Sequence, residues 1–552
     1  MLKNLNLVDW LTIGVYAVLL VSIALYHSRK MNRQDDFFLA GRTMSRWPIA
    51  LSMFMALFST NSLIGTVGWV NRPHGTVWIL LGTLGLMAAV PASIWLFPAV
   101  FFKLRVRTAY EYLEARFNYP VRALAALLFL GARAMWMATM LYAASLLISM
   151  MLGWTPEQGI ANGEIWTIVI LGGLALMLAF AGGMRAVIWT DCFQFFVMMT
   201  GVIAIVVVGI SYSGGPAEIY RAALAAGKLE LPRFFSVTDD ISFITLFLFG
   251  FSSLLFSTGA DQVYLQTYLT AKSEAESKAS ILRDGLLLKP LAVIFPMLGL
   301  ILFAYYRVHP FEASLMRVPD DALPVFILHV LPAGIRGMMV AAFTSALLTS
   351  LEGGMAAMSA TVQIDFVGRW RKSPLGNADA VRLGRLLVLI WGLLVILGAV
   401  WIRALGAENN VLQILNIVMY PFSGVLLGIF LLGLLFSRAS GPGVLAGGMA
   451  GFVTVLLFAL GPKLVGALHG MAVSPSWLAG LLQNLGAVST FYYCVIGAVA
   501  TVVFGLGASC CLATPPGEKT AGLTRWSLHE RGGSETDEYR DPDRLAVKDQ
   551  LA

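Results

Sequence analysis

Residues 339–366, MVAAFTSALLTSLEGGMAAMSATVQIDF, are long and apolar enough to cross a bilayer as a helix, yet they carry hydroxyls and carboxylates. Ala346, Thr349 and Ser350 stand at positions i, i+3 and i+4, so on a helix a backbone carbonyl and two hydroxyls share one face. Oxygen ligands suit a hard cation such as sodium. The alternative is that both hydroxyls bond back to carbonyls of their own helix or to a neighbouring helix.

The composition of the whole chain agrees with a membrane location. Of its 552 residues, 58% are hydrophobic and 12% are charged, and apolar runs of about twenty residues recur from end to end. This predicts an all-α polytopic membrane protein with the lipid bilayer as its surroundings. The net charge of +7 is spread over short loops, so it indicates topology and no nucleic-acid partner. No obligatory protein partner is evident from the sequence.

The four cysteines lie inside or at the ends of apolar runs, without metal-ligand spacing. They are Cys192, Cys494, Cys510 and Cys511. We therefore expect neither a disulfide nor a metal cluster.

About thirteen membrane spans are expected. They lie near residues 8–26, 47–71, 76–101, 122–153, 164–181, 187–212, 241–268, 282–306, 337–362, 384–404, 411–436, 440–460 and 489–513. Lys and Arg gather in alternate loops, which favours a multi-pass protein of the cell membrane with its N-terminus outside and its C-terminus in the cytoplasm. Within one such loop, Thr108 followed by Glu111 has the form of a capping box that opens a short helix.

Two of these spans look broken. The second places the polar run 59–62 at mid-membrane depth, and the seventh places small and polar residues just before Asp261 and Gln262. Irregular backbone at that depth is tolerated only where it lines a protein cavity. Each broken span opens a block of five spans, which is the layout of an inverted repeat with a site at its interface. The alternative is a pair of ordinary helices with small packing faces.

The chain can be divided accordingly into four parts. We expect an N-terminal extra helix and cytoplasmic loop (1–46), an inverted-repeat transport core (47–436), C-terminal extra helices (437–513) and a disordered cytoplasmic tail (514–552).

Several motifs in order along the chain resemble those of the solute:sodium symporter family, which are secondary transporters with the LeuT-type fold. The matching stretches are DFFLAGR (36–42), TAYEYLEARF (108–117), GGMRAVIWTDCFQ (182–194), DQVYLQTYLTAKS (261–273) and AxxTS (346–350) followed by Asp365. The resemblance implies a five-plus-five inverted repeat with two broken helices, and sodium as the co-transported ion. The motifs are nearest to the sialic acid branch and to the branch carrying iodide, monocarboxylates and vitamins.

The resemblance also implies a sodium site and a neighbouring substrate pocket. Sodium would be held by the carbonyls of Met55, Phe58 and Ala346 and the hydroxyls of Thr349 and Ser350. The substrate pocket would be formed by Ser59, Thr60, Asn61, Ser62, Arg133, Ser257 and Gln262.

Departures from relatives of known specificity narrow the substrate. Ser257 and Ser62 replace a gating tyrosine and a sugar-contacting glutamine of sodium–galactose transporters, and Leu57 replaces an aspartate of proline transporters. Arg133 aligns instead with an arginine that sialic acid transporters use for the substrate carboxylate, so we expect a small, carboxylate-bearing anion. The alternatives are a sugar or other neutral solute, and a transporter-like channel or sensor. No nucleophile–base pair or metal-ligand cluster points to an enzyme.

Asp191 and Glu352 form the least expected pair. Glu352 lies three residues beyond Thr349, nearly on the same helical face, and should approach Asp191. The resemblance places an additional sodium of sialic acid transporters near these positions. Two neighbouring carboxylates in a low-dielectric interior need a counter-charge. The pair therefore predicts a second cation or proton site, with an ion pair to Arg133 as the structural alternative.

Overall fold

The computed structural model describes residues 5–28, 33–57, 60–154, 160, 162–316, 318–371, 375–404, 411–470, 476–511 and 520–528. Within these ranges, side chains are described for all residues except 28, 57, 60–62, 181, 411–420, 462–464, 466–470 and 476.

The described chain is all-helical. Its α-helices are α1 (Leu7–Ser28), α2 (Gln34–Leu39), α3 (Arg46–Leu57), α4 (Thr60–Asn71), α5 (Leu81–Leu96), α6 (Pro98–Lys103), α7 (Ala109–Arg116), α8 (Tyr119–Leu152), α9 (Gly163–Tyr212), α10 (Pro216–Ala225), α11 (Phe243–Gly259), α12 (Gln262–Leu269), α13 (Glu274–Arg283), α14 (Ile294–Val308), α15 (Pro310–Ala313), α16 (Ala322–Val330), α17 (Ile335–Thr361), α18 (Gly368–Trp370), α19 (Asn377–Ala404), α20 (Val411–Leu435), α21 (Gly441–Gly470), α22 (Ser476–Gly486) and α23 (Tyr493–Cys510).

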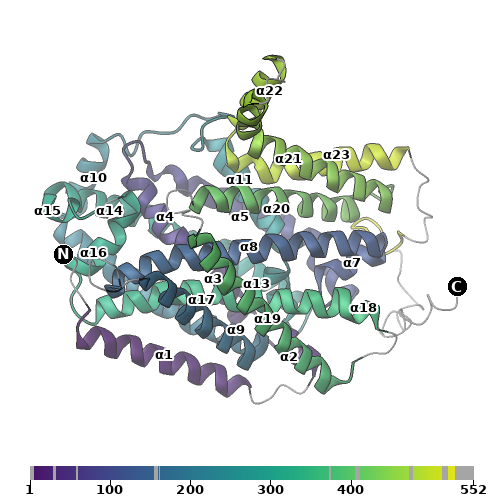
Figure 1. Ribbon diagram of the computed structural model, residues 1–552, viewed down its shortest axis with the longest axis horizontal. Helices are drawn as coiled ribbons and strands as arrows, with labels where there is room; N and C mark the ends of the chain where they lie inside the picture. The colour runs from purple at the N-terminus through teal and green to yellow at the C-terminus, as the bar shows by residue number, and fades with distance from the viewer. Residues whose placement is uncertain are drawn as a thin grey trace.

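The long helices run along one direction and surround α17. In Figure 1 helices α1, α8, α17, α20 and α23 extend roughly along the long axis of the view, with α10, α15 and α16 at one end and α7 and α18 at the other. In the most apolar part of the segment Ile335–Trp370, 89% of residues are buried, compared with 22% for both α1 and α19. Helix α17 is therefore the centre of the bundle, and its hydroxyls and carboxylate face protein and not lipid.

The predicted spans are helical, but the count of thirteen is only partly accounted for. Ten segments of the described chain are long and apolar enough to cross a membrane, or eleven if the bent pair α11–α12 is one span. The other two predicted spans correspond to α20 and to the pair α3 and α4, which flanks residues 58–59 outside the described chain.

Irregular backbone divides several of these segments. Helices α11 and α12 meet at an angle of 58° around Ala260 and Asp261. Helix α9 is split into two spans at Gly183, whose φ of 54° and ψ of −174° only glycine adopts without strain. A π-helical turn, Asp284–Leu288, interrupts the segment between α13 and α14. Turns of this type are frequent at functional sites, and no residue type announces them in the sequence.

The predicted capping box is confirmed. Glu111 accepts a hydrogen bond from the backbone N–H of Thr108 at 3.2 Å and opens α7. The Thr108 hydroxyl also donates to Asp365 at 2.8 Å, and Arg122 pairs with the same carboxylate at 2.6 Å. The cap thus ties the loop helix α7 to the segment that follows α17.

Residues 520–528 contradict the expectation of a tail that is disordered from residue 514 onward. This segment packs against the end of the bundle that carries α7. The Arg525 backbone N–H donates to Leu434 at 2.8 Å, the Trp526 indole donates to Leu435 at 2.9 Å, and the Tyr112 hydroxyl donates to Leu523 at 3.0 Å. We call residues 520–528 the tail clasp. It is ordered because carbonyls left open at the end of α20 accept its hydrogen bonds.

Candidate functional site

A cavity of about 420 Å³ lies between α3, α4 and the bent segment that α11 forms with α12. Its walls come from α3 and α4, from α5 and α8, and from α11, with further residues from the segment after α13 and from α20 and α23. The lining is mostly apolar and aromatic. It includes Phe54, Trp136, Phe249, Phe256 and Phe295, with a few polar groups contributed by Thr66, Thr83, Arg133, Ser253, Ser257, Asp261, Lys289 and Ser423. This volume and composition are typical of a site for a small organic molecule.

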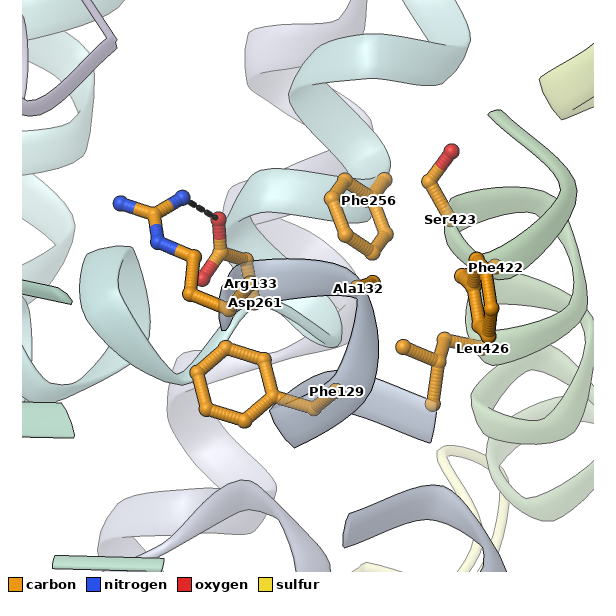
Figure 2. A pocket seen from close by; sticks show the side chains of 8 residues that line it. All are labelled: Phe129, Ala132, Arg133, Phe256, Asp261, Phe422, Ser423 and Leu426. Carbon is orange, nitrogen blue, oxygen red and sulfur yellow. Dashed lines mark hydrogen bonds and ion pairs between the residues drawn. The ribbon is translucent and has the colours of Figure 1, made fainter. Parts of the chain in front are cut away.

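Arg133, on α8, is a buried, positively charged residue of the cavity lining. It is 5% exposed, its Nη1 lies 3.5 Å from Asp261 Oδ2, and its guanidinium stacks over Trp136 at 4.3 Å. Figure 2 shows this pair beside an apolar wall made by Phe129, Phe256 and Phe422. Within the described chain, Arg133 Nε and Nη2 have no hydrogen-bond partner. Burying such donors is costly, so they are available to a ligand that enters the cavity.

This arrangement corrects the structural alternative for Arg133. The ion-pair partner expected for Arg133 from the sequence is Asp191 or Glu352, whereas the structure pairs Arg133 with Asp261. The difference arises at the break between α11 and α12, which brings Asp261 into the cavity.

The other predicted substrate residues divide into three groups. Ser257 lines the cavity. Gln262 does not, because its amide accepts from Ala109 N–H at 2.8 Å and donates to the Arg107 carbonyl at 3.1 Å, so it joins α12 to the start of α7. Phe58 and Ser59 lie outside the described residues, and Thr60, Asn61 and Ser62 are described only as the first residues of α4.

The predicted sodium ligands that are described lie on α3 and α17. Met55 is buried on α3, which packs against α17. The Ser350 hydroxyl donates to the Ala346 carbonyl at 3.3 Å, and the Thr349 hydroxyl donates to the Ser345 carbonyl at 2.9 Å. The Ser350 proton is therefore bound within α17, as the structural alternative describes, whereas the single Thr349 proton is shared between the Ser345 carbonyl and the side-chain carbonyl of Gln194 on α9. The oxygen lone pairs of both hydroxyls remain as acceptors.

Asp191 and Glu352 belong to one buried polar cluster between α9 and α17. Each is 1% exposed. Asp191 Oδ2 accepts from the Ser52 hydroxyl, and Glu352 Oε2 accepts from Thr190 at 3.4 Å. Within the described chain, Asp191 Oδ1 and Glu352 Oε1 have no hydrogen-bond partner, and neither carboxylate belongs to an ion pair. Because Glu352 contacts Thr190, the residue directly before Asp191, the two carboxylates lie in the same part of the interface between α9 and α17.

Gln194 links this cluster to the predicted sodium face. It lies one turn beyond Asp191 on α9, and its side-chain carbonyl accepts from the Thr349 hydroxyl. Tyr16 of α1 approaches Gln194 from the other side and accepts from the Ser345 hydroxyl at 2.8 Å. The N-terminal extra helix therefore reaches the residues that hold Thr349 in place.

Sequence reasoning missed two charged residues and a tryptophan of the cavity, Asp261, Lys289 and Trp136. Trp136 lies three residues after Arg133 on α8, a spacing that could have indicated it. Lys289 follows the π-helical turn and pairs with the buried Asp284 at 2.8 Å. No local signal reveals this pair, because both members lie in a segment that otherwise has the composition of an ordinary span.

Comparison with known proteins gives one family and a consistent set of relatives. The model of the sodium:solute symporter family matches residues 37–451. The sodium-dependent multivitamin transporter of Oryctolagus cuniculus is 29% identical over 86% of this chain and 73% of its own length. The sodium/sialic acid symporter of Proteus mirabilis is 24% identical over 91% of this chain and 95% of its own.

Among solved structures, a Na⁺-coupled sialic acid symporter in a substrate-bound, outward-open state shares the fold. It superimposes with a TM-score of 0.79 at 22% identity and covers 92% of this chain and 99% of its own.

We predict that two neighbouring positions on α11 differ in their access to a thiol reagent. With the four native cysteines replaced by serine, we expect Ser253→Cys to react with a membrane-impermeant methanethiosulfonate reagent, because Ser253 lines the cavity. Ser252→Cys is the matched control, since Ser252 is 5% exposed and bonded to the Phe249 carbonyl at 3.2 Å. Equal modification of both positions, measured by mass spectrometry, would show that this face of α11 does not border a cavity.

Proposed function

Because the chain belongs to the sodium:solute symporter family, we propose that it uses the sodium gradient to take up a small organic anion bearing a carboxylate. Coupled symport of sodium and a solute, across a membrane that the chain crosses several times, follows from the family and the helices. The observation that supports a carboxylate is Arg133, whose two open donors border a cavity of about 420 Å³. Relatives named for sialic acid and for monocarboxylates point to the same chemistry.

The finer topology is part of the proposal. We place thirteen spans in the cell membrane, with the N-terminus outside and the C-terminus in the cytoplasm, and a five-plus-five inverted repeat. The bend between α11 and α12 supports a broken helix at the seventh span, and we place the corresponding break in the second span. Alternating access would then expose the cavity to one side of the membrane at a time.

A mid-membrane arginine is hard to reconcile with a neutral solute. A guanidinium at that depth costs at least ~2.5 kcal/mol on insertion scales, so its retention indicates a partner or a ligand. The planar fork can bind a carboxylate through two parallel hydrogen bonds.

The direct test of this function is transport by the purified protein. In liposomes with an inward sodium gradient, we expect electrogenic uptake of carboxylates, compared across N-acetylneuraminate, lactate and pantothenate with glucose and proline as neutral or zwitterionic controls. Uptake of glucose without any carboxylate would contradict the proposal. Solute flux without sodium dependence would indicate a channel.

Sodium should bind at the face shared by Ala346, Thr349 and Ser350. Replacing both hydroxyl residues by alanine removes two oxygen ligands, so the sodium concentration for half-maximal uptake should rise about tenfold or more. Thr344→Ala is the control, because Thr344 has the same hydroxyl on another face of α17. An unchanged sodium dependence in the double variant, at normal expression, would rule out this site.

Arg133 should recognise the substrate carboxylate by its shape as well as its charge. Arg133→Lys keeps the charge but loses the fork, so the KM for a carboxylate substrate should rise about tenfold, consistent with a lost charged hydrogen bond. Full transport by this variant would contradict bidentate recognition. The melting temperature in detergent separates a recognition defect from unfolding.

The Asp191 and Glu352 carboxylates should hold a second cation or a proton. With Arg133 paired to Asp261, neither carboxylate has a basic partner within the described chain. Glu352→Gln should therefore change either the charge moved per substrate, measured as current against radiolabel uptake, or the pH dependence of uptake. If both stay unchanged while only the melting temperature falls, Glu352 is structural and one coupling site remains.

A further inference from the structure

The Asp261 carboxylate pairs with Arg133 in the way that a substrate carboxylate would. It lies between α11 and α12, 4% exposed, and borders the same cavity. Its Oδ2 faces Arg133 Nη1, as the dashed line in Figure 2 shows. The sequence analysis did not assign Asp261 to any site.

The two carboxylate oxygens of Asp261 have separate tasks. Oδ1 accepts from the Val263 backbone N–H at 2.9 Å and caps α12, while Oδ2 faces Arg133 at 3.5 Å. The cap is short and the ion pair is long. The carboxylate is therefore held mainly by the helix end, and its contact with Arg133 is the weaker of the two.

The pair is also incomplete on the side of Arg133. Only Nη1 is engaged by Asp261, while Nε and Nη2 have no hydrogen-bond partner within the described chain. A carboxylate that engages two guanidinium nitrogens in parallel outcompetes a single contact of 3.5 Å.

We propose that Asp261 is an internal competitor that holds Arg133 in the empty cavity and is displaced by the substrate carboxylate. The inference rests on the proposed function, because it takes Arg133 to be the residue that binds the substrate. When the substrate binds, Asp261 keeps its hydrogen bond from the Val263 backbone N–H, and its ion pair with Arg133 breaks. When the substrate leaves, Asp261 pairs with Arg133 again and assists release.

This exchange joins binding to the bend of the broken span. Before binding, one carboxylate connects α8, through Arg133, to the start of α12, whose eight residues are all buried. After binding, that connection is broken, so α12 is no longer tied to α8 through this ion pair. Asp261 is thus a positioning residue for transport, and it lowers apparent affinity in exchange for faster release.

The exchange also changes the local charge. Arg133 and Asp261 together are neutral. When the substrate carboxylate joins them, the three groups carry one net negative charge in a low-dielectric interior. A co-bound sodium ion offsets this charge, so substrate affinity should depend on sodium partly through Asp261.

Asp261→Asn tests the inference because it removes the competing charge while an asparagine oxygen can still cap α12; its melting temperature is measured beside that of the wild type. The purified full chain in liposomes is assayed with whichever of N-acetylneuraminate, lactate and pantothenate it accumulates. If Arg133 is free in only about a third of the empty molecules, removing the competitor lowers KM about threefold. We expect this lower KM together with a lower kcat and a weaker sodium dependence of KM.

Three further variants complete the experiment. Asp261→Ala should also lower KM but with a reduced melting temperature, because the cap is lost. In Arg133→Gln, adding Asp261→Asn should bring no further fall in KM, since the competed residue is absent. Glu164→Gln is the control, as it removes a carboxylate from an ion pair with Arg403, 2.8 Å long, outside the cavity lining.

The outcomes separate the two claims. If Arg133→Gln impairs carboxylate uptake and Asp261→Asn raises KM or leaves it unchanged, the displacement is wrong and anion recognition by Arg133 stands. If Arg133→Gln leaves carboxylate uptake unchanged, or the wild-type chain accumulates none of the three probes, the proposed function fails and the inference fails with it.

Discussion

The buried guanidinium of Arg133 constrains the arrangement around the cavity. At membrane depth, lipid cannot satisfy its donors, so protein, cavity water or a ligand must do so. The structure meets this need only in part, with one long contact to Asp261 and the face of Trp136. Bringing Asp261 to Arg133 requires the break between α11 and α12, and that break in turn needs a cap, which the same carboxylate provides. One side chain therefore joins the charge, the bend and the cavity.

The buried cluster that contains Asp191 and Glu352 differs from the Arg133 site in the partners of its charged groups. Hydroxyls and an amide surround the Asp191 and Glu352 carboxylates, contributed by Ser52, Thr190, Gln194 and Thr349, and neither carboxylate forms an ion pair with another described residue. Neutral donors orient a carboxylate without cancelling its charge, which leaves the charge for a mobile ion. Under the proposed function, the cavity would combine a fixed cation with an exchangeable anion, while the centre between α9 and α17 would combine fixed anions with an exchangeable cation.

The sequence was sufficient to predict features that depend on composition or on spacing within one helix. Apolar runs located the spans, the Thr108 and Glu111 pair located a helix start, and spacing on α17 brought Ala346, Thr349 and Ser350 to one face. Features that depend on a change of direction were missed. Asp261 and Gln262 are adjacent in sequence, but the bend sends one into the cavity and the other to the backbone of residues 107 and 109. Only tertiary contacts distinguish two such neighbours.

The tail clasp has a consequence for the order in which the protein is made. Every helix that it contacts precedes it in the chain, so a ribosome finishes α5, α7 and α20 before residues 520–528 emerge. Until then, the carbonyls of Leu434 and Leu435 at the end of α20 lack the bonds that the clasp supplies. The membrane domain can therefore insert completely and still be unfinished at one end. Docking of residues 520–528 therefore takes place only after α23 has been translated.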